Sequence, residues 1–118
     1  MSATAGLSWK GSNASVSGLV GWHTGWPRTP LDFSPLQVGS RNSARWGDFI
    51  SVDLRGSWIW TYDNGDLTAV VDVTNATNRS NPCCVVLDME ESSALTTETN
   101  SWLPALINIG FTYRWRSR

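Results

Sequence analysis

The sequence is poor in charged residues, and it has no long apolar run. Charged residues make up 16% of its 118 residues, below the roughly 25% that is usual for soluble domains. The net charge is −1, so no basic excess is present to neutralise phosphates, and we expect no nucleic-acid partner. No apolar stretch approaches the roughly 20 residues of a transmembrane helix. The first residues lack the basic start and apolar middle of a signal peptide.

The side chains that build catalytic and metal sites are equally scarce. His23 is the one histidine, and Cys83 and Cys84 are adjacent, which fits neither a metal spacing nor a CxxC redox motif. The sequence has no Gly-x-Ser-x-Gly elbow and no phosphate loop. We therefore expect no enzyme, no catalytic residue, no metal site and no cofactor. Cys83 and Cys84 form a possible disulfide; otherwise they are loop cysteines without a partner.

Tryptophan is abundant, with 8 copies against a single lysine. Tryptophan favours places where one edge of the ring is apolar and the other is wet, such as interfaces and membrane boundaries. A Trp-rich core or a sugar-binding surface also uses many tryptophans. Composition alone does not choose among these environments.

Hydrophobic alternation predicts antiparallel strands. Between residues 103 and 116 the odd positions are apolar and the even positions are mostly polar, with Leu106 as the exception, which is typical of a strand with two different faces. The same period of two occurs upstream, and Asn64-Gly65 between two alternating segments is a strong hairpin signal. We predict an all-β, up-and-down antiparallel meander of about five strands, at about 5–10, 14–23, 47–61, 66–76 and 103–116.

The predicted connections alternate between short and long. Residues 11–13 and 62–65 form short turns, whereas residues 24–46 and 77–102 form long loops. Short turns at one end and long loops at the other are the layout of a transmembrane β-barrel, and strands of about 9–11 tilted residues cross the bilayer. The prediction for residues 1–118 is therefore one β-barrel segment, without a plug domain, that is part of a barrel or assembles into one.

The aromatic residues fall near the two ends of these strands, as the girdles of a membrane barrel do. Capping of a soluble sandwich core is the alternative reading. The candidate membrane-interface aromatics are Trp9, Trp22, Trp46, Trp58, Trp60, Trp102, Tyr113 and Trp115.

Three segments resemble the late barrel strands of TonB-dependent outer-membrane receptors. They are Trp46-Gly-Asp-Phe-Ile-Ser-Val-Asp-Leu-Arg-Gly-Ser-Trp, Val71-Asp-Val-Thr-Asn-Ala-Thr-Asn-Arg and Leu103-Pro-Ala-Leu-Ile-Asn-Ile-Gly-Phe-Thr-Tyr-Arg-Trp. The resemblance covers residues 5–116. It implies a C-terminal piece of a nutrient importer in the bacterial outer membrane, whose partners are membrane lipid, further barrel strands and a plug. The family usually ends on an aromatic residue, whereas this sequence continues past Trp115.

In such a barrel the polar strand faces line the lumen, and the long loops face outward. The lumen-facing candidates are Asp53, Arg55, Asp72, Thr74, Arg114 and Arg116. The possible ligand contacts in or beside the first long loop are His23, Trp26, Arg28, Arg41 and Arg45. Structural bracing of the lumen and an interfacial histidine are the plainer interpretations of these residues.

About five strands cannot close a membrane barrel, because the smallest such barrels have about eight strands. We therefore expect a wall segment that is not transport-competent alone. Two alternatives stay open. In one, identical copies pair edge to edge into an oligomeric sheet or barrel; in the other, the chain folds as a soluble β-sandwich that binds carbohydrate through exposed tryptophan.

Overall fold

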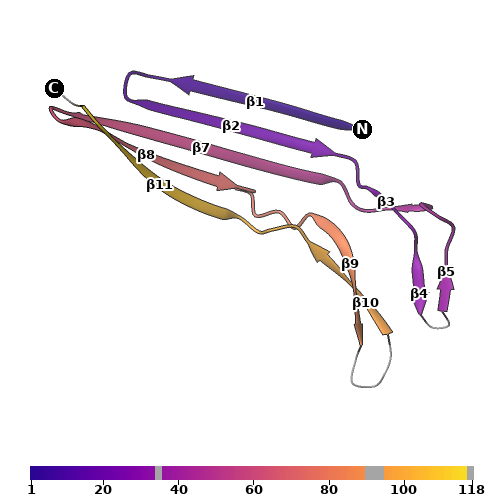
Figure 1. Cartoon of the computed structure of the whole chain (residues 1–118). Coiled ribbons are helices and arrows are strands. Elements are labelled where there is room, and N and C mark those ends of the chain that lie inside the picture. Colours follow the sequence, from indigo (N-terminus) through magenta and orange to yellow (C-terminus); the bar gives the residue numbers. More distant parts are fainter. Residues whose placement is uncertain (34–35, 90–94, 117–118) are drawn as a thin grey trace.

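The computed structural model describes residues 1–33, 36–89 and 95–116, and it is an all-β structure over these ranges. Its main feature is an antiparallel sheet of five strands in the order β1-β2-β7-β8-β11, which is open and not closed into a barrel (Figure 1). The predicted five-stranded meander is confirmed. The strands are β1 (Ser2–Lys10), β2 (Ala14–His23), β7 (Phe49–Tyr62), β8 (Gly65–Thr74) and β11 (Leu106–Trp115).

Several strands begin or end at other residues than predicted, because a proline, a positive φ or a pairing partner sets the end. β2 agrees at both ends. β11 begins at Leu106 rather than at residue 103. Its even-numbered residues form the backbone hydrogen bonds to β8, and Pro104 cannot extend this series because it has no N–H to donate. β8 ends at Thr74 because Asn75 has a φ of 50°. β1 begins at Ser2, which pairs with His23 at the far end of β2.

The two long connections are not irregular throughout, which corrects the prediction of plain loops at 24–46 and 77–102. Val and Thr residues, which suit strands, face one another in the second connection; Val85 pairs with Thr99 there. Residues 34–35 and 90–94 lie outside the described residues. The additional strand pairs are β3 (Pro27–Arg28) with β6 (Ala44–Arg45), β4 (Leu31–Phe33) with β5 (Leu36–Val38), and β9 (Pro82–Met89) with β10 (Leu95–Ser101).

These additional strands extend from one end of the sheet, whereas the short turns β1–β2 and β7–β8 lie at the other end (Figure 1). The molecule is accordingly elongated, with extents of 75 × 35 × 22 Å. None of the described residues belongs to a helix that is long and apolar enough to cross a membrane.

The sheet has one apolar face without a charged residue. Directly paired residues of antiparallel strands share a face and alternate faces along each strand, so the register assigns every position. The apolar face carries Ala3, Ala5, Leu7, Trp9, Ala14, Val16, Val20, Trp22, Ile50, Val52, Leu54, Trp58, Trp60, Tyr62, Leu67, Ala69, Val71, Val73, Ile107, Ile109, Phe111, Tyr113 and Trp115, together with glycines.

The opposite, polar face carries the serines, threonines and charged residues of the same strands. This face also carries a few large apolar residues: Leu19, Phe49, Ile59, Val70 and Leu106. Val70 and Leu106 interrupt the alternation of β8 and β11, and they lie opposite Gly110 and Thr74. The sheet is therefore amphipathic along its full width.

Nothing in the described part of the chain covers the apolar face. Among the described residues no hydrophobic side chain is buried, and Ile109 is 64% exposed. The accessible area is 9112 Å², against about 6,300 Å² expected for a compact chain of this mass. The radius of gyration is 22.1 Å, where a compact domain of this length has about 13 Å. The described residues form a single layer and not a two-layer sandwich.

Both outer strands leave backbone groups unpaired toward the outside of the sheet. The Gly11 N–H donates to the Ala14 carbonyl, so the odd-numbered residues of β1 direct their N–H and C=O groups toward β2. The backbone groups of the even-numbered residues of β1 therefore point away from the sheet. The Arg116 N–H donates to the Asn64 carbonyl, so in β11 the even-numbered residues direct their backbone groups toward β8. The backbone groups of the odd-numbered residues of β11 point away from the sheet. Each edge can therefore accept a further strand.

Candidate functional site

Four of the predicted lumen residues line one shallow hollow of about 380 Å³ on the polar face, between β1, β2, β7 and β8. Asp53 accepts hydrogen bonds from the Ser51 hydroxyl at 2.7 Å and from the Asn75 N–H at 2.9 Å. Its carboxylate therefore holds the chain where β8 ends. The four residues are Asp53, Arg55, Asp72 and Thr74.

Arg55 and Asp72 are direct cross-strand partners, and Arg55 Nε lies 3.5 Å from Asp72 Oδ1. Both side chains are well exposed, so solvent screens the pair and its net contribution is small. The pair neutralises the hollow locally. Asp53, the other carboxylate of the hollow, is held by its hydrogen bonds from Ser51 and Asn75, so the arrangement fits a braced polar wall.

The other two lumen candidates lie at the hairpin end and outside this hollow. Arg116 Nη2 is 2.8 Å from Asp66 Oδ1, and Arg114 is the cross-strand partner of Asp66. The structure thus divides the predicted lumen residues into two groups on the polar face, one around the hollow and one at the hairpin end.

Asparagine side chains build the corner where β8 leaves the sheet. Asn75 and Asn78 both have a φ of 50°, a left-handed conformation that Asn tolerates better than other non-glycine residues. The Asn75 amide donates to the carbonyls of Arg79 and Leu103 and accepts from the Arg79 N–H. Asn78 Oδ1 accepts from the Ala105 N–H at 2.9 Å. The corner therefore ties the entry of β9 to the entry of β11.

Asn81 acts as a substitute strand partner for β7. Its Oδ1 accepts from the Ile50 N–H at 2.9 Å, and its Nδ2 donates to the Ile50 carbonyl at 2.8 Å. The side chain is almost fully buried at 1% exposure. At Ile50 the β7–β8 pairing has already stopped, because its register begins at Leu54. Asn81 thus satisfies backbone groups that the sheet leaves open.

An aromatic cluster stands beside this corner, on the polar face at the end of the sheet away from the hairpin turns. The His23 ring stacks on Phe49 with centroids 4.7 Å apart and on Trp26 at 5.0 Å. Trp26 meets Trp102 edge to face at 6.2 Å. These four rings line a hollow of about 250 Å³ together with Ser51, Thr74, Asn75, Asn81 and Leu103. Of the predicted ligand contacts, the structure brings His23 and Trp26 together here.

The arginines of the first connection do not line the aromatic hollow. Arg28 lies over the Trp46 ring, 4.7 Å from its centroid, and Arg45 donates to the Gly25 carbonyl at 3.2 Å. Arg41 is exposed. Two of the three guanidinium groups therefore hold the connection in place.

The predicted interface aromatics occupy three settings. Trp9, Trp58, Trp60, Tyr113 and Trp115 lie on the apolar face toward the hairpin turns. Neighbouring rings pack against each other there: Trp58 against Trp60, and Tyr113 against Trp115.

The three remaining aromatics lie toward the other end. Trp22 lies on the apolar face, and its indole N–H donates to Asp48 at 3.2 Å. Trp46 and Trp102 lie outside the main sheet, and Trp102 belongs to the aromatic hollow. The two aromatic belts expected from the sequence are thus denser at the hairpin end.

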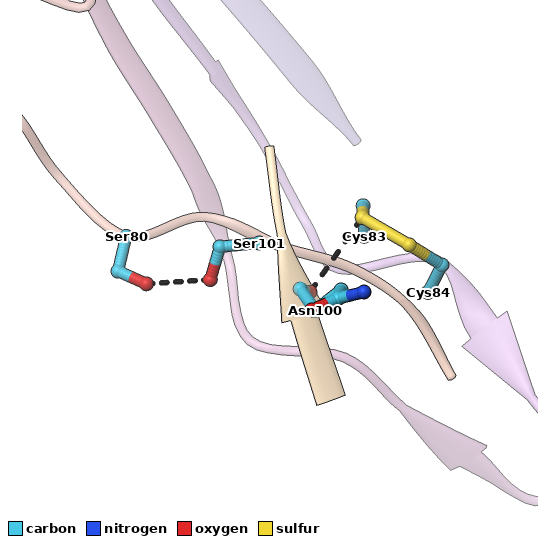
Figure 2. Close-up of a disulfide and its surroundings, with 5 residues drawn as sticks. All are labelled: Ser80, Cys83, Cys84, Asn100 and Ser101. Atoms are coloured by element: carbon cyan, nitrogen blue, oxygen red, sulfur yellow. Dashed lines mark hydrogen bonds between the residues drawn. A yellow bond between two sulfur atoms is a disulfide. The ribbon is translucent and has the colours of Figure 1, made fainter. Parts of the chain in front are cut away.

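Cys83 and Cys84 follow Pro82 at the start of β9, and their sulfur atoms are joined in a disulfide between chain neighbours (Figure 2). Asn100 of β10 lies across from this pair, and Ser80 and Ser101 share a hydrogen bond nearby (Figure 2). None of these residues lines the aromatic hollow.

The site residues that sequence reasoning missed are Phe49, Asn75 and Asn81. Phe49 alternates onto the polar face, and the asparagines act through backbone contacts that sequence spacing does not reveal. Within the described ranges, no group of three or more His, Cys, Asp or Glu side chains is placed to hold a metal ion.

Comparison with protein-family models, curated proteins and solved structures found nothing that matches this chain.

Proposed function

We propose that this chain is a wall segment of a TonB-dependent outer-membrane nutrient importer, and that it is not transport-competent alone. The observation that carries the proposal is the charge-free apolar face of a single-layer sheet with no buried hydrophobic core among its described residues. A surface of this kind is stable when hydrocarbon covers it. Lipid supplies that cover in a barrel wall, while the polar face lines the lumen.

Strand length supports a membrane setting. The 10 residues of β2 span about 30 Å at about 3.3 Å per residue. A tilt of about 40° reduces the height to about 23 Å, close to the roughly 25 Å apolar band of outer-membrane barrels. The aromatic rings toward the hairpin turns then lie at one boundary, and Trp22 lies at the other.

The positions of the family-like segments support the importer class. The three segments that resemble TonB-dependent receptors cover most of β7, the end of β8 and all of β11, which are consecutive neighbours in the sheet. The asparagine-rich part of the second segment forms the corner described above. In this proposal the short turns face the periplasm, and the long connections face the outside.

The strand directions favour missing strands over a ring of identical copies. β1 and β11 both run toward the hairpin end, since Lys10 and Trp115 lie there. Copies arranged with all hairpin turns on one side would need a parallel junction between β11 and β1. An odd number of further strands closes the barrel with antiparallel junctions throughout, as in known outer-membrane barrels.

The wall assignment is tested by refolding the chain into vesicles whose acyl chains carry bromine, a contact quencher of tryptophan emission. We expect strong quenching relative to plain lipid. Trp58→Phe removes quenched emission because Trp58 is on the apolar face, whereas Trp26→Phe removes mostly unquenched emission. Equal emission in both lipids, together with a monomer in plain buffer, contradicts the proposal.

The importer assignment is tested separately in the cells that make this protein. An antibody against the chain should detect an outer-membrane band far larger than 13.0 kDa. A band of the chain's own mass in the soluble fraction contradicts it.

A further inference from the structure

We infer that the aromatic hollow formed by Phe49, His23, Trp26 and Trp102 binds a neutral aromatic ring of a small solute. This inference rests on the proposed function, which places the polar face along a solute path. It adds a ligand class that the barrel assignment does not supply.

The ring faces of the hollow are held open and in place. Trp26 and Trp102 are 48% and 47% exposed, so each has surface available for contact. The Trp102 N–H donates to the Asn81 carbonyl at 2.8 Å, and the Trp26 carbonyl accepts from the Trp46 N–H at 3.0 Å. These bonds hold the backbone of both residues, and the contacts of Trp26 with His23 and Trp102 orient the rings, so little conformational freedom is lost when a ligand enters.

The lining that the structure describes offers no charged side chain to a ligand, and it disfavours a sugar. No Asp, Glu, Lys or Arg lines the hollow among the described residues. The amides of Asn75 and Asn81 are already bonded to backbone groups, and the Ser51 hydroxyl donates to Asp53. Sugar hydroxyls therefore find few free partners, whereas an aromatic ring needs only the exposed ring faces.

The size of the hollow agrees with one ring system. A cavity of about 150 Å³ is enough for benzene, and this hollow measures about 250 Å³. Both faces of the His23 ring are already covered by Phe49 and Trp26, so a ligand ring would meet Trp26 and Trp102, in the offset-stacked or edge-to-face geometries that aromatic pairs prefer.

The test titrates the detergent-solubilised chain with benzamide and with cyclohexanecarboxamide, which has the same polar group on a non-aromatic ring, and follows the ligand by NMR against empty micelles. We expect benzamide to bind and the cyclohexyl analogue to bind more weakly. Trp26→Ala and Trp102→Ala should each weaken benzamide binding roughly three- to tenfold. Trp115→Ala, at the hairpin end, should leave it unchanged.

Equal binding of both amides, stronger binding of methyl glucoside, or unchanged binding in both site variants overturns the inference. The bromine experiment is independent of this one, because it reports on the apolar face. A chain that inserts into vesicles but ignores benzamide leaves the wall assignment standing and removes the aromatic site.

Discussion

Placing a charge on the apolar face should prevent stable membrane insertion, whereas the same charge one residue away on the polar face should be tolerated. Ile109 lies in the middle of β11, opposite Val71, and is 64% exposed. If lipid covers this face, Ile109→Arg places a guanidinium near the bilayer midplane. The expected cost is about 2–4 kcal/mol, or roughly a 30- to 900-fold loss in the ratio of inserted to free chain.

Asn108→Arg is the matched control, because Asn108 is the adjacent residue of the same strand and lies opposite Asp72 on the polar face. An arginine there gains an opposite charge across the ladder, so we expect a change within about 1 kcal/mol. Both variants add the same side chain to the same strand, and only the face differs.

The assay is the partition of each variant between lipid vesicles and urea-containing buffer, followed by tryptophan emission. The reasoning predicts a large loss for Ile109→Arg and almost none for Asn108→Arg. For a chain whose apolar face meets water, Ile109→Arg costs nothing and raises solubility. Equal partition of the two variants, or a larger loss for Asn108→Arg, refutes the membrane wall.

Three further predictions concern the corner and the turns, each measured as a shift in the urea midpoint of the refolded chain. Asn81→Ala should cost about 1–3 kcal/mol, because it leaves both backbone groups of Ile50 unpaired. Asn75→Gly should cost less than Asn75→Ala, since glycine keeps the positive φ and both lose the side-chain bonds; equal losses would show that the backbone conformation is unimportant. Gly65→Ala should destabilise the β7–β8 hairpin, because the added methyl collides with the Arg114 carbonyl, while Gly56→Ala, with open space around it, is the control.

The faces of the sheet could be predicted from the sequence because alternation is a local property. The assignments at Ile107, Ile109 and the rest of β11 follow from period two alone, and the register agrees with them. The exceptions Val70 and Leu106 did not shift the register, because a slip of one residue moves every apolar side chain to the wrong face.

The corner could not be predicted, because its bonds join residues that are distant in sequence. Asn81 and Ile50 are 31 residues apart, and nothing in a run of Ser, Thr and Asn marks which amide will replace a strand. The β9–β10 pair was missed for a related reason. The residues of β9 and β10 do not alternate between apolar and polar, and it is the pairing of the two segments with each other that stabilises them as strands.

The most direct test of the amphipathic wall is a nitroxide scan of residues 106–115 in vesicles, one labelled cysteine at a time, in a chain with Cys83→Ser and Cys84→Ser. Oxygen, which concentrates in lipid, should relax the labels at the odd positions, and a water-soluble nickel complex should relax those at the even positions. Collision rates that show no period of two, or that peak for oxygen at the even positions, contradict a β11 that faces lipid with Ile107, Ile109 and Phe111.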